Sequence, residues 1–157
     1  MVANRGQRYF YLPLSGIVTA YVDVRAMRIG ITADLHLTAR KDHPERYHSL
    51  ENIFSQLETE GSQTLIVAGD LFDKDFRNYS EFEKLLKKHT QVQMHIIPGN
   101  HDSNISEKAI VAPNVHVYSE PASVDLGSVT FVFIPYREET NMGDEIAALK
   151  ERIEGRE

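Results

Sequence analysis

The chain has 157 residues, of which 41% are hydrophobic and 25% are charged, and its net charge at pH 7 is −6. This length supports one domain with its own core, and the mildly acidic balance argues against a broad basic surface for nucleic acid. There is no cysteine, which excludes disulfides, thiolate catalysis and thiolate metal sites. Any metal must therefore be held by His, Asp, Glu or Asn, a donor set that suits Mn, Mg, Fe or Zn.

The first 26 residues differ from the rest of the chain. Two arginines precede an uncharged stretch at 9–22, which is too short to span a bilayer. Its Tyr, Pro, Ser and Gly residues make a poor signal peptide, and the small residues at 18–20 are a weak cleavage site. We therefore interpret 1–26 as an appended strand or a loose tail, with the domain over 27–157. We expect a cytoplasmic protein without a membrane segment.

From residue 27 onward, the hydrophobic pattern alternates between strands and helices. Strands are predicted at 29–33, 64–68 and 92–97, with helices between them at 44–60 and 79–89. A short strand at 115–118, a hairpin made of 122–126 and 129–135, and a helix from about residue 142 follow. The β-α-β-α-β order favours an α/β fold in which helices pack on a parallel sheet.

The helical segments have apolar residues at helical spacing. In the first, Pro44 suits the opening turn and Gly61 follows the end. The side chains predicted to face the core are Tyr47, Leu50, Ile53, Phe54 and Leu57 in the first helix and Tyr79, Phe82, Leu85 and Leu86 in the second. In the last helix, Ile146, Leu149 and Ile153 are in register.

Three polar clusters follow the three predicted parallel strands. They are Asp34-Leu35-His36, Gly69-Asp70 and Gly99-Asn100-His101-Asp102. In an open α/β sheet, ligands bind beyond the carboxyl ends of the strands, and parallel strands place those ends at one edge. We therefore expect the three clusters to converge although they are far apart in the sequence.

The residue types in these clusters indicate metal-assisted hydrolysis. Asp34 and His36 lie two residues apart after a strand, where both can turn toward one ion. Asp70 has two carboxylate oxygens and is able to bridge two ions, while Asn100 offers a neutral oxygen to the second. Paired divalent ions, about 3.5–4 Å apart, activate water and clamp the reacting oxygens in phosphoryl chemistry.

The last two residues of the third cluster have catalytic rather than ligand roles in this interpretation. His101 is placed to protonate the leaving oxygen or to stabilise charge on the phosphoryl group, and Asp102 is placed to orient its ring. Each short cluster alone also fits an ordinary polar turn, because Gly and Asp are common turn residues. The remaining histidines, which are His43, His48, His89, His95 and His116, are predicted to be surface or structurally satisfied residues.

Together these clusters resemble the first three signatures of the calcineurin-like metallophosphoesterases over roughly residues 27–140. In their extended form they are Asp34-Leu35-His36-Leu37, Gly69-Asp70-Leu71-Phe72-Asp73 and Gly99-Asn100-His101-Asp102-Ser103. These are most similar to the nuclease subunit of SbcCD-type DNA repair complexes and to its phage recombination-endonuclease relatives. The resemblance implies a metallophosphoesterase-type sheet sandwich flanked by helices, with this chain forming its N-terminal half.

The resemblance also implies roles, cofactors and partners. Asp34 and His36 would bind a first metal, Asp70 would bridge both metals, Asn100 would bind the second, and His101, supported by Asp102, would be the catalytic acid. The cofactors would be two divalent ions, usually Mn²⁺ in nuclease members, with Mg²⁺, Fe or Zn as alternatives. The implied partners are DNA, an SMC-like ATPase subunit and a second copy of the chain.

One departure from the family pattern changes the expectation for this chain. The family has three further histidines on later strands, and no histidine follows His116. We therefore expect the N-terminal part of a longer enzyme, or a truncated product, that binds metal weakly and hydrolyses little alone. Three functions stay open: a DNA exo- or endonuclease, a phosphoesterase acting on small phosphoesters, and a non-catalytic module for partner binding or assembly.

Overall fold

The computed structural model describes residues 9–14, 17–24 and 27–154, and the predictions for residues 1–8 lie outside this part. The main sheet has the strand order β1 (Tyr9–Leu14), β2 (Ile17–Val24), β3 (Met27–Thr32), β4 (Thr64–Ala68), β5 (Gln93–Ile97) and β6 (Val115–Val117). Strands β3 to β6 are parallel, and β1 and β2 extend the sheet as an antiparallel pair beside β3. The predicted α/β class with a parallel sheet is confirmed.

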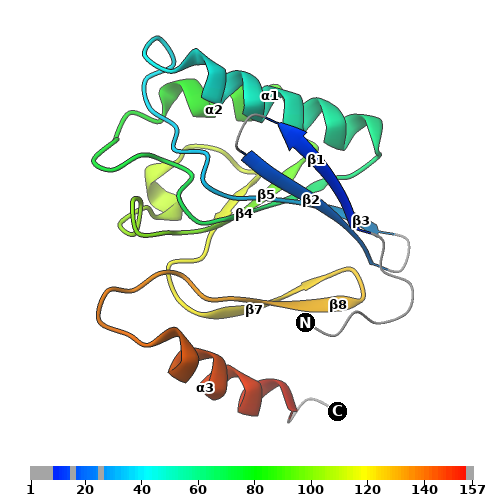
Figure 1. The fold of residues 1–157 in the computed structure, drawn as a ribbon, viewed down its shortest axis with the longest axis vertical. Helices are drawn as coiled ribbons and strands as arrows, with labels where there is room; N and C mark the ends of the chain where they lie inside the picture. The colour runs from blue at the N-terminus through cyan, green and yellow to red at the C-terminus, as the bar shows by residue number, and fades with distance from the viewer. Residues whose placement is uncertain (1–8, 15–16, 25–26, 155–157) are drawn as a thin grey trace.

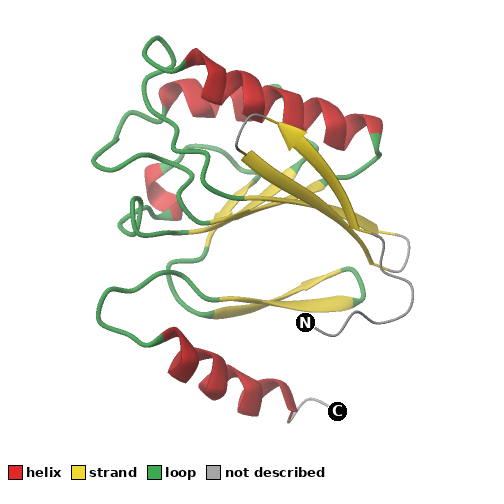
Figure 2. Cartoon of the chain, viewed as in Figure 1, coloured by secondary structure: helices red, strands yellow, loops and turns green. Residues whose placement is uncertain are grey.

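The sheet has different coverings on its two faces (Figures 1 and 2). Helices α1 (Pro44–Thr59) and α2 (Ser80–Leu86) cover one face. The separate two-stranded hairpin of β7 (Ala122–Leu126) and β8 (Val129–Phe133) lies on the other. Helix α3 (Met142–Glu154) lies beyond the hairpin, and a single 3₁₀ turn, η1 (Glu107–Ala109), connects β5 to β6.

Helix α1 agrees with its sequence pattern. Pro44 stands in its first turn, and all five side chains predicted to face inward are buried against the sheet. The Tyr47 hydroxyl at the base of this face donates a hydrogen bond to the Thr38 carbonyl oxygen at 3.2 Å. The helix therefore packs on the sheet and is also tied to the loop that follows β3.

Helix α2 is shorter than the predicted 79–89. The N–H groups of Lys88 and His89 donate to the carbonyl oxygens of Leu85 and Leu86, three residues back, at 3.0 Å each. Such i→i−3 bonds tighten the chain out of the α-helix. The predicted inward face is otherwise present, since Phe82, Leu85 and Leu86 are buried and the partly buried Tyr79 packs beside them.

The strand ends and the last helix differ from the predictions in detail. Strand β3 begins at Met27 and ends at Thr32, because the chain turns into a left-handed conformation at Asp34. In α3, Leu149 is buried, but Ile146 is 53% exposed, and the side chain of Ile153 lies outside the described residues. The segment interpreted as an appended strand or a tail contains the strands β1 and β2.

No helix in the described part of the chain is both long and apolar enough to cross a membrane. The longest of them, α1, has 16 residues and carries charged side chains along its exposed face.

Candidate metal centre

The three polar clusters meet at one edge of the sheet, where β3, β4 and β5 end. The strands are parallel and adjacent, so the loops that follow them emerge side by side. His36, Asp70 and His101 each offer one donor atom, and these atoms lie within 4.8 Å of one another. The predicted convergence is confirmed for these three residues.

The backbone at this edge is held in an uncommon conformation. Asp34, His36 and Asp70 have positive φ angles of 56°, 45° and 49°. Non-glycine residues rarely adopt this left-handed region, and such strain is characteristic of functional sites. The loops are fixed by hydrogen bonds from His36 N–H to the Asp70 carbonyl at 2.9 Å and from Leu37 N–H to the Leu71 carbonyl at 2.8 Å. These turns direct the polar side chains toward one another while the intervening leucines stay in the core.

Gly99 allows the third loop to lie directly against Asp70. A Cβ atom at position 99 would come within 2.2 Å of Asp70 Oδ1 and 2.5 Å of the Asp70 backbone nitrogen. Side chains and backbone cannot share that space, so position 99 requires glycine. The His101 N–H then donates to Asp70 Oδ1 at 2.9 Å, which orients the carboxylate of the central residue.

The His101 ring lies next to a carboxylate whose role the sequence analysis did not identify. Its Nδ1 is 3.2 Å from Asp73 Oδ1, and Asp73 Oδ2 accepts a hydrogen bond from Arg46 at 3.2 Å. Arg46 also donates to the carbonyl oxygen of His36, so one guanidinium links two of the loops. Asp73 closes the Gly-Asp-x-x-Asp segment, and its spacing from Asp70 was the signal that would have identified it.

The pKa of Asp73 reflects these contacts. Partial burial works to raise it, but hydrogen bonds from the Lys74 N–H, Arg46 and His101 outweigh that effect and lower the pKa below the ordinary aspartate value. Asp73 is therefore held as a carboxylate beside the His101 ring.

Asp102 has different partners from the predicted ones. Its carboxylate is buried and accepts the Gly99 N–H at 2.7 Å and the Phe72 N–H at 3.1 Å. Burial raises its pKa, and the backbone hydrogen bonds oppose that shift. Asp102 thus braces the loop after β5 against the loop after β4, and Asp73 lies beside the His101 ring in the position that the sequence analysis assigned to Asp102.

The remaining predicted ligands lie at the rim of the cluster. The Asp34 side chain is 69% exposed, with Oδ1 at 3.9 Å from His36 Nε2. Asn100 is exposed on the loop between Gly99 and His101. Their roles as ligands stay predictions.

The donor chemistry of the cluster fits a divalent ion. Two imidazole nitrogens and a carboxylate oxygen form a mixed N/O set of the kind that Mn, Fe and Zn accept. The imidazoles of His36 and His101 lie with ring centroids 4.7 Å apart. The other five histidines are outside the cluster in the described part of the chain. His95, for example, is buried against Tyr118 and has its Nδ1 2.8 Å from the tyrosine hydroxyl.

Comparisons with known proteins agree with this geometry. A model of the calcineurin-like phosphoesterases matches residues 27–150. A probable cyclic nucleotide phosphodiesterase of Coxiella burnetii (strain RSA 493 / Nine Mile phase I) is 31% identical over 113 residues, which is 69% of this chain and 44% of that protein. The chain therefore spans less than half the length of this curated relative.

A solved structure is similar in fold. The crystal structure of the Pseudomonas putida nuclease MPE aligns with a TM-score of 0.51 and 21% sequence identity, over 75% of this chain and 63% of that chain. At this identity the likeness establishes the fold alone.

Proposed function

Because the chain belongs to the calcineurin-like phosphoesterases, we propose that it is a metal-dependent phosphodiesterase acting on DNA. The observation that supports this most directly is the convergence of donor atoms from His36, Asp70 and His101 within 4.8 Å. The similarity of the three motifs to SbcCD-type nuclease subunits supports the choice of substrate. In this proposal the partners are an SMC-like ATPase subunit and a second copy of the chain, in a DNA repair or recombination complex.

The ligands in this proposal come from all three loops. His36 and Asp70 hold the first ion together with Asp34, and Asp70 and Asn100 contribute to a second. Bound divalent ions supply Lewis-acid polarisation of the phosphoryl oxygens and a water that ionises near neutral pH. Mn²⁺ is the expected ion, with Mg²⁺, Fe or Zn as alternatives.

Although its ring belongs to the cluster of donor atoms, His101 is proposed as the general acid and not as a metal ligand. Its Nδ1–H donates to Asp73, which fixes the ring and leaves Nε2 as the atom that faces the reacting groups. From there it donates a proton to the oxygen that leaves the phosphorus. Arg46 keeps Asp73 in place through Oδ2, and Asp102 acts on the backbone of the loop rather than on the ring.

A second candidate is a phosphodiesterase for small cyclic nucleotides. The relative from Coxiella burnetii, at 31% identity, has this name and supports it. The third function left open by the sequence, a non-catalytic module for partner binding or assembly, stays a candidate.

One set of measurements separates these candidates. Calorimetric titration of the chain with Mn²⁺ is expected to show binding that Asp70→Asn abolishes, because the carboxylate is the central donor. Slow Mn²⁺-dependent cleavage of a linear duplex DNA, lost in the same variant, is the expected activity. Asp125→Asn is the matched control, since Asp125 is an exposed carboxylate on β7 that pairs with Thr130. Asparagine also tolerates the left-handed backbone at position 70.

The alternative outcomes are distinct. Faster hydrolysis of a cyclic nucleotide than of DNA would favour the second candidate. Mn²⁺ binding without hydrolysis of either substrate would favour the third. His101→Gln should reduce hydrolysis about 100-fold if His101 is the acid. A comparable loss of Mn²⁺ affinity in that variant would instead make it a ligand.

A further inference from the structure

A cleft of about 460 Å³ lies between the loops that follow β3 and β4. Thr38 to Lys41 form one wall, and Phe76, Asn78, Ser80 and Glu81 form the other. None of these residues belongs to the proposed metal site. Both walls nevertheless begin within a few residues of that site, because Thr38 lies two residues beyond His36 and Phe76 three residues beyond Asp73.

The two walls are joined to the metal site by backbone pairing. Leu37 and Phe72 form a parallel bridge, and the Asp73 N–H donates to the Leu37 carbonyl at 3.0 Å. The two loops therefore leave the site together and separate only beyond it. A substrate longer than its scissile phosphate can extend from the metal site into the space between them.

One wall of the cleft is cationic. Arg40 is engaged, since it pairs with Glu51 at 2.8 Å and lies over the Tyr47 ring at 5.4 Å. Lys41 is exposed and its side chain has no partner among the residues that the structure describes. The one acidic side chain of the lining, Glu81, is paired with Lys84 at 2.6 Å. Lys41 is therefore the charge available to an incoming anion.

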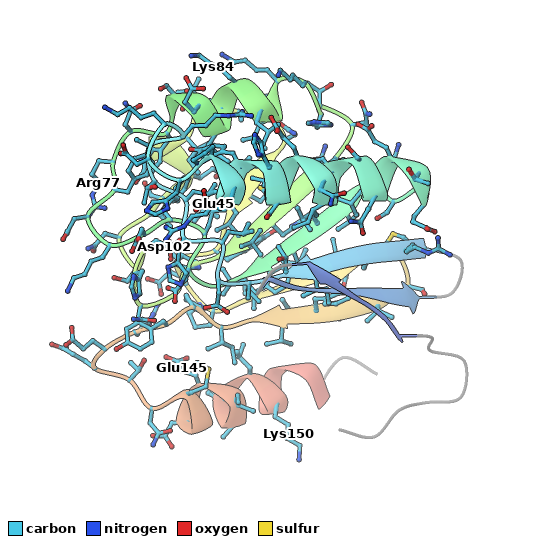
Figure 3. All side chains as sticks on the ribbon, turned by 45° about the horizontal axis from the view of Figure 1, so that its top comes forward. Glu45, Arg77, Lys84, Asp102, Glu145 and Lys150 are labelled. Carbon is cyan, nitrogen blue, oxygen red and sulfur yellow. The ribbon has the colours of Figure 1, made fainter. Side chains whose placement is uncertain are left out.

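The opposite wall is aromatic and polar. Phe76 is half-buried and is supported by Phe72, with ring centroids 5.9 Å apart. Asn78 is exposed on the same wall, and its Oδ1 accepts hydrogen bonds from the Ser80 N–H at 3.2 Å and the Ser80 hydroxyl at 2.7 Å. On the cationic wall, Thr38 Oγ1 is buried and has no hydrogen-bond partner. Arg77, which Figure 3 labels, is outside the lining, and its guanidinium donates to the Phe76 carbonyl oxygen at 2.8 Å.

We infer that this cleft binds the nucleotide next to the scissile phosphate of a polynucleotide, with its base on Phe76 and its phosphate on Lys41. The inference rests on the proposed phosphodiesterase function and specifies its substrate. A supported aromatic ring and a free cation are the two elements by which proteins bind single-stranded nucleic acid without reading its sequence. A cyclic nucleotide has one phosphate, which the metal site would hold, and leaves Lys41 without a ligand.

The test measures binding rather than hydrolysis. Fluorescence anisotropy measures binding of a fluorescein-labelled hexathymidylate to the full chain in EDTA. Because EDTA removes divalent ions, the metal site does not contribute to binding and no substrate is hydrolysed. Phe76→Leu is expected to weaken binding about tenfold, because stacking is lost while apolar volume is kept. Phe76→Tyr should bind as the unchanged chain does. Lys41→Ala should weaken binding and lower the salt dependence by about 0.7 in the logarithmic slope, as loss of one phosphate contact predicts.

Control variants distinguish binding in the cleft from a nonspecific attraction of the oligonucleotide to any surface lysine. Lys41→Arg should restore the slope, and Lys108→Ala, an exposed lysine on η1 outside the cleft, should change neither affinity nor slope. Unchanged hexathymidylate binding in both Lys41→Ala and Phe76→Leu would overturn the inference. Because no metal or activity is involved, failure here would leave the proposed hydrolysis to be judged by its own assay.

Discussion

The two faces of the main sheet are covered very differently. On the helix side, a continuous cluster that includes Leu50, Phe54 and Phe72 is almost fully buried. On the hairpin side, the fully buried members of the described cluster are Ile29, Ile66 and Phe133, and the residues around them are only partly buried. Since hydrophobic stabilisation grows with the apolar area removed from water, the helix side supplies most of it among residues 27–150, whose side-chain burial the structure describes.

The candidate metal centre belongs to the strongly packed side. Leu35 and Leu37 alternate with the site residues of the first loop and lie in the helix-side cluster, as do Leu71 and Phe72 of the second. The alternation explains how a strained turn persists: the leucines anchor the backbone while the polar side chains between them face outward. This protein therefore uses its best-packed core to hold its most strained loops.

The largest expected difference between the faces is in core truncation. Phe54→Ala should lower the free energy of unfolding by about 4 kcal/mol, because it opens a cavity in a fully enclosed cluster. Phe133→Ala should cost less than about 3 kcal/mol, since its partly exposed neighbours can collapse into the space. Urea unfolding of both variants measures these losses of unfolding free energy. Equal losses would contradict the difference between the two faces of the sheet.

The next effect is a pH dependence that arises on the hairpin side. Burial, with a smaller contribution from the charge of His116, lowers the pKa of His95 to about 4. An unfolded histidine has a pKa of about 6.5, so between these values the unfolded chain binds more protons. Stability should therefore fall by at most about 3 kcal/mol as pH drops from 6.5 toward 4. Urea midpoints at pH 7.5, 6 and 5 would reveal it.

The groups around His95 define the control. They are the Tyr118 hydroxyl at 2.8 Å, the stacked His116 ring and the tilted Phe133 ring. His95→Gln keeps a polar partner for Tyr118 but does not titrate in this range. Its unfolding midpoint should depend less on pH than that of the unchanged chain. An unaltered pH profile in this variant would assign the acid sensitivity to other groups.

The smallest expected effects come from replacing one glycine in each region, Gly99 beside Asp70 and Gly127 in the hairpin. Gly99→Ala forces a Cβ onto the Asp70 carboxylate, and we expect Mn²⁺ affinity to fall at least about tenfold, as for other changes in groups that orient ligands. Gly127→Ala in the β7–β8 turn should cost about 1 kcal/mol, from its positive φ of 65°, because its Cβ meets only the flexible end of Met27. Calorimetric Mn²⁺ titration of both should show a loss for Gly99→Ala alone.

The local pattern of apolar and polar residues in the sequence was sufficient to predict much of the fold and the location of the site. The apolar spacing of α1 predicted all of its buried face, and the position of polar clusters after parallel strands predicted the edge at which they meet. These features depend on periodicity and on the geometry of parallel sheets, which are visible in a single sequence.

The finer features depended on contacts between distant residues. The pairing of Asp73 with His101 is such a contact, as is the use of Asp102 to brace backbone N–H groups rather than a ring. Helix α2 ends before the predicted residue because its last turn tightens into i→i−3 hydrogen bonds. Residue propensities do not distinguish such a turn from a further turn of α-helix. Ile146 is 53% exposed whereas Leu149 is buried, a difference that their shared helical spacing did not reveal.

The hydrogen bonds across the metal centre join residues about thirty positions apart: His101 N–H with Asp70, and Phe72 N–H with Asp102. During synthesis from the N-terminus, the loops after β3 and β4 leave the ribosome well before the loop after β5. The ion-binding geometry is therefore complete only after Asp102 has emerged and β5 has paired, since non-local pairings form late. Acquisition of Mn²⁺ would then report on a late step of folding, and a nascent chain halted before β5 should bind none.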